Sequence, residues 1–280
     1  MTLTQPDWHA HLALGFAQDG STTRLTERSH TGPLRVQKPL YPEGAGICHA
    51  IVLHPPGGVV GGDQLALSAT VGQHAHAVLT TPGAAKWYRA NGRISRQHIA
   101  LTIANGASLE WLPQESIFFD EANVELTQSI AVGKNASYIG CEILCLGRTA
   151  SGESFNSGKI TQRTSVRYED RLIWSEQGQL AGGSSAMHSP LVMSGKTVCA
   201  TLLAVGKPIS AALLQTIRQD VESMGAPDGD FGISQIKSLV VLRYLGTSSE
   251  VARNVLLCGW KHLRPTLIGC QAVVPRIWNT

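Results

Sequence analysis

Hydrophobic and polar residues alternate along most of this chain in short runs. Such alternation places successive side chains on opposite faces and is typical of β-strands with one buried face. Gly, Asn, Asp and Pro mark most of the breaks between runs, as at Ala104-Asn105-Gly106. The short connections favour an antiparallel or coiled β architecture over a βαβ sheet. The predicted strands cover residues 50–53, 65–71, 75–81, 97–103, 108–112, 124–132, 138–146, 159–168, 172–175 and 198–205.

Two segments in the last third of the chain have helical periodicity instead. The first segment covers residues 208–224, and its apolar stripe consists of Ile209, Leu213, Ile217 and Val221. A second helix is predicted over residues 247–263, because Thr247-Ser248-Ser249-Glu250 has the spacing of a capping box and Pro265 follows. Its stripe consists of Val251, Val255, Cys258 and His262. Both stripes are expected to face the core, although one of them could meet a partner.

Composition narrows the possible partners of the chain. Charged residues make up 15% of its 280 residues, hydrophobic residues make up 43%, and the formal net charge is +3. A small, scattered positive charge without a long Lys or Arg run argues against nucleic acid as a partner. No apolar run approaches the length of a membrane span, and the opening residues do not resemble a signal peptide. We therefore expect a cytoplasmic protein that makes no membrane contact.

The spacing of cysteines and histidines does not predict a closed metal site. The six cysteines are scattered without a C-x-x-C pair, which is compatible with reduced thiols. Cys141 and Cys145 are predicted to share one side of a strand as core residues. His74 and His76 would project to one face of another strand, but two ligands are too few for a committed site. We expect no tightly bound cofactor.

The segment from Leu53 to Asp63 contains two prolines and four glycines within eleven residues. Prolines fix φ and glycines permit positive φ and close approach of other groups, so this segment predicts a rigid, unusual loop that ends in a carboxylate. No Gly-Lys-Ser/Thr follows it, and the residues after it alternate like a strand, which argues against a phosphate-binding loop. His54 lies in the same loop, where it could bind a metal ion or hydrogen-bond a loop carbonyl.

Several acidic residues stand in or beside apolar or glycine-rich stretches. A partly buried carboxylate is unfavourable unless it meets a cation, a metal ion or several hydrogen-bond donors. Simple structural roles are available, since Asp63 could accept backbone N–H groups of its own turn and Glu142 or Glu153 could pair with Arg148. The set consists of Asp63, Glu115, Glu142, Glu153 and Glu176.

Blocks along nearly the whole chain together resemble the urease accessory protein family called UreD or UreH. Cys141 stands where the family usually has Trp. The blocks are Gly32-Pro33-Leu34-Arg35-Val36-Gln37-Lys38-Pro39, Tyr41-Pro42-Glu43-Gly44, the loop from Leu53 to Asp63, Leu79-Thr80-Thr81-Pro82-Gly83-Ala84-Ala85-Lys86-Trp87-Tyr88-Arg89, Gly106-Ala107-Ser108-Leu109-Glu110-Trp111-Leu112-Pro113-Gln114-Glu115, Gly140-Cys141-Glu142, Leu146-Gly147-Arg148, Val241-Leu242-Arg243-Tyr244-Leu245-Gly246 and Pro275-Arg276-Ile277-Trp278-Asn279-Thr280.

The resemblance implies a mainly β fold, with a β-helix-like body of many short strands and two α-helices in the C-terminal third, as a single domain over residues 1–280. It also implies a non-enzymatic assembly factor that acts with UreF, UreG and the urease apoprotein subunits during nickel insertion. Family accounts of an internal nickel route favour Asp63 and Glu176 as transient metal contacts, and the loop position of His54 adds this residue.

The alternative function is a metal-dependent hydrolase. Its candidate residues are His54, Asp63, His74 and His76. No catalytic dyad or triad is recognisable, and Gly182-Gly183-Ser184-Ser185 lacks the glycine spacing of a nucleophile elbow. The sequence therefore favours the assembly factor.

Overall fold

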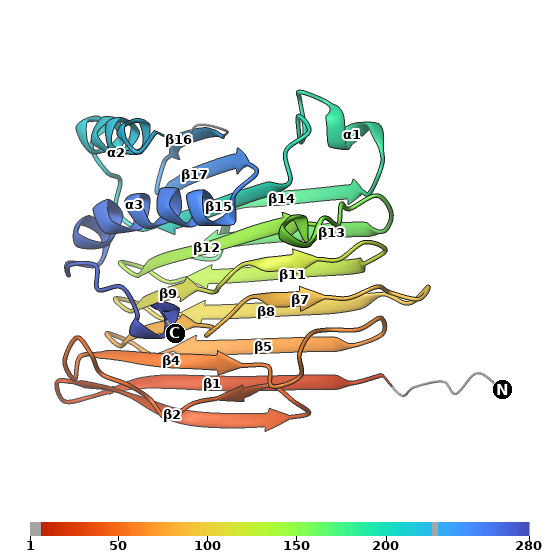
Figure 1. Ribbon diagram of the computed structural model, residues 1–280. Coiled ribbons are helices and arrows are strands. Elements are labelled where there is room, and N and C mark those ends of the chain that lie inside the picture. The colour runs from red at the N-terminus through yellow and green to blue at the C-terminus, as the bar shows by residue number, and fades with distance from the viewer. Residues whose placement is uncertain (1–6, 226–228, 280) are drawn as a thin grey trace.

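A computed structural model describes residues 7–225 and 229–279 of the chain. Most of the chain winds into stacked coils of short strands, which form two long sheets with helices at one end and on one side (Figure 1). Strands contain 48% of the residues and helices 16%. The predicted mainly β fold with a β-helix-like body and C-terminal helices is confirmed.

The first sheet has the strand order β14-β13-β11-β8-β5-β1-β2. The parallel strands β1, β5, β8, β11 and β13 form its centre, and an antiparallel partner closes each edge. The strands are β1 (His9–Asp19), β2 (Thr22–Thr31), β5 (Gln64–Val71), β8 (Ser95–Ile103), β11 (Asn123–Val132), β13 (Lys159–Tyr168) and β14 (Arg171–Ala181).

The second sheet has the order β16-β17-β15-β12-β9-β6-β4-β3. Its parallel part contains β4, β6, β9 and β12, and two short strands, β7 and β10, pair alongside β12. The strands are β3 (Arg35–Val36), β4 (Ile47–Leu53), β6 (His76–Thr80), β7 (Ala85–Trp87), β9 (Ser108–Leu112), β10 (Ser116–Phe118), β12 (Ser137–Leu146), β15 (Val198–Val205), β16 (Asp230–Ile236) and β17 (Leu239–Gly246).

The chain alternates between the two sheets, so strands of successive coils stack in register. One inward-facing row of the first sheet runs through Leu14, Ala69, Leu101, Ile130 and Val166, all of them buried. Side chains from both sheets meet in one apolar cluster, which is the main core. Burial of this row desolvates one face of each strand and explains the alternating pattern that predicted β5, β8, β11 and β13. β1 has the same pattern but was not among the predicted strands.

Within the described residues, three α-helices accompany the sheets: α1 (Ser185–His188), α2 (Ala211–Ser223) and α3 (Ser249–Leu267). The side chain of Ser210 caps α2 by accepting from the N–H of Leu213, and Ser248 caps α3 by accepting from the N–H of Val251. The predicted start of the second helix at Thr247 is therefore two residues before the first helical residue, Ser249. A second core cluster forms where α3 packs on β12, β15 and β17 (Figure 1).

The predicted end of the second helix before Pro265 is wrong, since α3 continues through this proline to Leu267. A proline in the last turn removes one intrahelical hydrogen bond. Burial of Leu263, Arg264 and Leu267 holds the turn against the sheet, and the N–H groups of Ile268 and Gly269 close it on the carbonyl of Arg264. Tertiary packing therefore outweighs the local signal.

A buried charge network attaches α3 to the coils. The guanidinium group of Arg264 is fully buried and donates to Glu43 at 2.6 and 2.9 Å and to Glu110 at 3.0 Å. Glu110 also accepts from Trp260 at 2.6 Å and lies 2.8 Å from His76, while His49 lies 2.7 Å from Glu43. Segments far apart in sequence are thus joined by charge-assisted hydrogen bonds in a desolvated setting.

This network predicts acid sensitivity. Burial alone would raise the pKa of Glu43, but hydrogen bonds from His49 and Arg264 outweigh it and lower the pKa to about 2. Because the pKa of Glu43 is lower in the folded state, its ionised form stabilises the fold. This stabilisation is complete above about pH 4.5, the ordinary pKa of the group, and is lost as the pH falls toward 2. We expect Glu43→Gln to destabilise the chain at neutral pH and to differ less from wild type below about pH 4. Urea unfolding across this range measures the difference, and a pH-independent difference would contradict the prediction.

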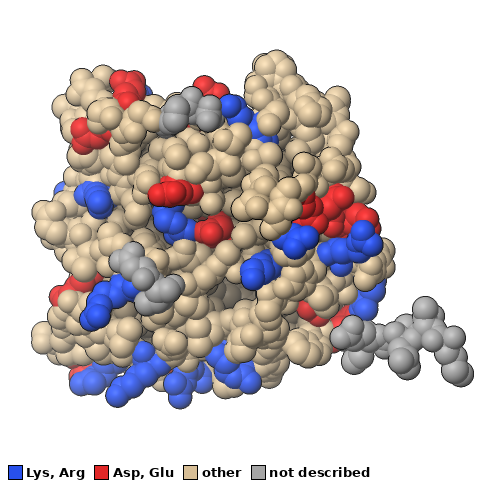
Figure 2. Space-filling model, in the orientation of Figure 1, with Lys and Arg blue, Asp and Glu red and all other residues tan. Residues whose placement is uncertain are grey.

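The surface is sparsely charged on the face drawn in Figure 2, where uncharged residues cover most of the area. Lys and Arg side chains gather along the edge at which β2 lies. Arg24 and Arg28 of β2 are both exposed, although a register shift against β1 between them turns their side chains to opposite sides of the strand. Positive charge is therefore more concentrated than the sequence predicted.

Candidate functional site

A cavity of about 260 Å³ lies between the two sheets. Apolar residues such as Leu67, Ile99 and Trp111 form much of its wall. Residues 56–59 of the glycine-rich loop and residues 81–86 also line it. The polar residues of the lining are His54, Thr81, Lys86, Gln97, Gln114, Ser116, Thr127, Gln128, Glu142, Gln162, Arg163 and Thr164.

Three glutamines of this lining occupy inward positions of the first sheet. Gln97 is in phase with buried Ile99 on β8, and Gln128 and Gln162 take the equivalent places on β11 and β13. Strand pairing puts Leu126 between Gln97 and Gln162, while Gln128 pairs with Ile99 and Thr164, so the glutamines lie in two adjacent inward rows. None of the three was predicted from the sequence. The signal that could have identified them is a glutamine at a strand position where the alternating pattern expects an apolar residue. A buried amide at such a position needs hydrogen-bond partners and therefore indicates a polar cavity.

His54 contributes an imidazole to the cavity. Its Nε2 atom is buried and has no hydrogen-bond partner among the described residues. Burial lowers the pKa of His54, and the negative charge of Asp63 partly offsets this effect. The ring is therefore neutral at physiological pH, which is the form that binds a metal ion. A buried, unpartnered nitrogen at a cavity wall is a plausible metal contact.

Glu142 supplies the carboxylate of the cavity. It belongs to the inward face of β12 and accepts a hydrogen bond from the amide of Gln162. Burial raises the pKa of Glu142 to about 7, while the Gln162 hydrogen bond opposes the rise. The group therefore changes charge near neutral pH, so a cation can replace its proton.

Glu176 lies at a second, smaller cavity that Glu142 also lines. Its carboxylate is 2.6 Å from Arg243, and this pair is partly exposed. Glu142 thus lines both cavities, whereas Glu176 lines only the smaller one. Two other acidic candidates have structural partners, since Glu153 pairs with Arg148 at 2.8 Å and Glu115 pairs with Arg253.

Asp63 closes the glycine-rich loop and is 5% exposed. Its carboxylate accepts from the N–H of Val60 at 3.0 Å and of Trp8 at 3.3 Å. It is not among the residues that line the cavity, although its charge reaches His54. The glycines permit close packing, since a Cβ on Gly61 would lie 2.0 Å from the carbonyl oxygen of Ala90. The loop ends in a buried carboxylate, and Asp63 lies outside the cavity lining.

The cysteines offer no thiolate to this cavity at neutral pH. Burial raises the pKa of Cys141, Cys145 and Cys199 to about 12, so their thiols remain protonated. Cys141 and Cys145 both pack in the cluster beneath α3, which confirms that they share one side of β12. Imidazole, carboxylate and amide groups are therefore the donors of the cavity.

The four residues of the hydrolase alternative do not come together. His74 lies outside β6 in an exposed turn with φ of 61°, whereas His76 pairs with Glu110 in the buried network. The prediction that these two imidazoles share a strand face is therefore wrong, because the strand begins only at His76. Within residues 7–225 and 229–279, the one group of three His, Cys, Asp or Glu side chains with metal-ligand spacing is Asp220, Cys258 and His262.

The site is thus a cavity with apolar and polar lining between the two sheets of a coiled β body. Comparison with known proteins specifies the family. The pattern of the family described as "UreD urease accessory protein" matches residues 9–279. The chain belongs to this UreD family.

Relatives named "Urease accessory protein UreD" cover nearly the whole chain. The protein of Janthinobacterium sp. (strain Marseille) is 56% identical over 271 residues, which are 97% of this chain and 91% of the relative. That of Nitrosospira multiformis is 52% identical over 97% of both chains, and that of Dechloromonas aromatica is 49% identical over 98% of this chain and 96% of the relative.

In the described part of the chain, no helix is long and apolar enough to span a membrane.

Proposed function

We propose that this chain is a non-catalytic, cytoplasmic assembly factor that acts with UreF, UreG and the urease apoprotein subunits while nickel enters urease. Nickel would pass through the cavity between the two sheets. The observation that carries this proposal is the polar layer inside the cavity, in which the unpartnered Nε2 of His54 and the titratable carboxylate of Glu142 line one space.

The donor chemistry supports transit rather than storage of the ion. Imidazole, carboxylate and amide groups bind nickel moderately and can release it, whereas several thiolates would hold it tightly. The buried thiols near the sheets remain protonated at neutral pH. Glu142 would be a central contact, with His54 on one side and Glu176 near the smaller cavity.

Affinity capture tests the proposal directly. A tagged chain is purified from cells that express the urease subunits, UreF and UreG, and the nickel content of urease is compared with that from cells without the chain. We expect the chain to retain these partners and urease without it to contain little nickel. Capture of none of them, or unchanged nickel in urease, would contradict the proposal.

Asp63→Asn is expected to lower the nickel content of urease more than it lowers stability. Asparagine keeps an oxygen that can accept from the N–H of Val60, so the stability loss should be about 1 kcal/mol. The negative charge near His54, which favours a cation, is lost. Nickel and activity of urease matured beside each variant are measured, and complex formation is checked by affinity capture.

Asp120→Asn is a matched control. Asp120 likewise accepts from backbone N–H groups, those of Asn156 and Ser157 at 2.8 Å, but does not line the cavity. This variant should activate urease normally. Normal nickel loading with Asp63→Asn would refute the nickel role of Asp63, and loss of the complex would assign the residue to structure or interface.

A further inference from the structure

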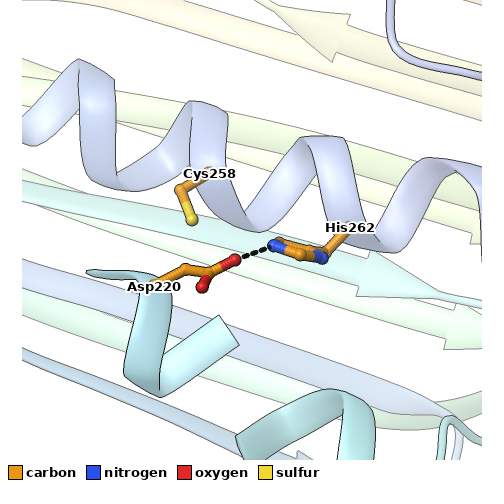
Figure 3. A group of neighbouring side chains, drawn as sticks. All are labelled: Asp220, Cys258 and His262. Atoms are coloured by element: carbon orange, nitrogen blue, oxygen red, sulfur yellow. Dashed lines mark hydrogen bonds and ion pairs between the residues drawn. The ribbon is translucent and has the colours of Figure 1, made fainter. Parts of the chain in front are cut away.

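Asp220, Cys258 and His262 form a cluster on the side of the molecule away from the cavity. Asp220 comes from α2, while Cys258 and His262 come from α3 (Figure 3). The Nε2 atom of His262 lies 2.7 Å from a carboxylate oxygen of Asp220. The side chain of Cys258 points toward the same carboxylate, and the three potential ligand atoms all lie within 4.8 Å of one another.

The helix register of this cluster suits a metal ion. Cys258 and His262 are four residues apart, so their side chains lie one turn apart on the same face of α3. That face is turned toward α2 and is only partly buried, which leaves the ligand atoms accessible. Metal-binding helices use the same spacing when they present two ligands to one ion.

The distances require only a small adjustment. Around a tetrahedral ion with bonds of about 2.0 Å to nitrogen or oxygen and 2.3 Å to sulfur, ligand atoms lie about 3.3 to 3.6 Å apart. The separation of 2.7 Å between Nε2 of His262 and the Asp220 carboxylate is shorter than this range, and all three ligand atoms lie within 4.8 Å of one another. Asp220 is exposed, so its side chain can rotate without disturbing the core.

We propose that Asp220, Cys258 and His262 bind a divalent transition ion of the zinc and nickel type, which clips α2 to α3. One imidazole, one thiolate and one carboxylate match the preferences of such borderline ions, and water would complete the coordination. Binding releases the thiol proton, which passes to solvent or buffer. With three protein ligands and an exposed rim, the ion exchanges freely. The site is separate from the cavity and does not depend on nickel delivery.

Cobalt(II) is the probe, because a thiolate bound to cobalt gives a charge-transfer absorption in the near ultraviolet. Titration of the full-length chain should produce this band and saturate at roughly one ion per chain, and Zn²⁺ should displace it. Cys258→Ser should abolish the band, and His262→Ala or Asp220→Asn should weaken binding about tenfold or more. Circular dichroism confirms that each variant is folded.

Two controls separate this cluster from other donors. Cys270→Ser removes another partly buried thiol of the C-terminal region, and His54→Ala removes the imidazole of the cavity. Both variants should keep the band at wild-type affinity. A wild-type titration without a thiolate band, or a band that persists in Cys258→Ser, would overturn the proposal.

Discussion

Glu142→Gln is expected to reduce the nickel content and activity of urease about tenfold while the accessory complex still forms. Loss of a charged contact worth about 1.5 kcal/mol or more corresponds to a factor of ten. Glutamine has nearly the same shape and remains polar, so the cavity keeps its size. The measurement is nickel per urease active site, together with activity, after maturation beside wild-type or variant protein.

Glu142→Gln should be more stable than wild type although urease receives less nickel, and this combination separates a nickel role from misfolding. The pKa of Glu142 is raised to about 7, so the folded state is penalised once the group ionises, and this penalty is complete only above pH 7. It is absent below the ordinary value near 4.5. Glu142→Gln should therefore unfold at higher urea than wild type above about pH 7 and nearly equally below about pH 4.

The matched control is Glu125→Gln. Glu125 forms a partly exposed pair with Arg96 at 2.8 Å and does not line the cavity. This substitution removes the same charge from the outside of the sheet, so urease should receive its normal nickel. If urease matured beside Glu142→Gln contains as much nickel as with wild type, the carboxylate is not part of the route.

The sequence could predict strands whose two faces differ in polarity. β11 alternates clearly, whereas β12 is a mostly apolar run buried on both faces, and the predicted bounds of both agree with the structure within one residue. β2 was missed, because it is exposed along most of its length and has no apolar face to set a period. It is held by antiparallel pairing with β1, which depends on backbone hydrogen bonds rather than on side-chain pattern. The parallel coil topology followed only from the family resemblance.

The candidate site could be predicted only in part, since spatial convergence depends on strand register. His54 and Glu142 were both singled out from sequence, but only the coil brings them to one cavity. Asp63 attracted attention through its loop, and the structure gives it backbone partners outside that cavity. The cluster of Asp220 with Cys258 and His262 spans two helices, so the local spacing of Cys258 and His262 could indicate only two ligands, and the fold brings the third.

Arg264→Met is expected to destabilise the chain by about 3 to 5 kcal/mol, the range for removing one partner of a buried ion pair. Its guanidinium group is fully buried and is shared between the carboxylates of Glu43 and Glu110. Methionine fills a similar volume but leaves both carboxylates without their cation. Urea unfolding of wild type and variant at neutral pH measures the loss.

Acidification and a second substitution test whether the unpaired charges cause this loss. Without Arg264, Glu43 loses hydrogen bonds that lower its pKa, so Arg264→Met should differ less from wild type near pH 4 than near pH 7. Adding Glu110→Gln should recover part of the stability, because it removes one of the unpaired charges. Arg148→Met, which breaks the partly exposed pair with Glu153, should cost far less stability than Arg264→Met. An equally small cost for Arg264→Met would show that the buried network does not hold α3 on the coils.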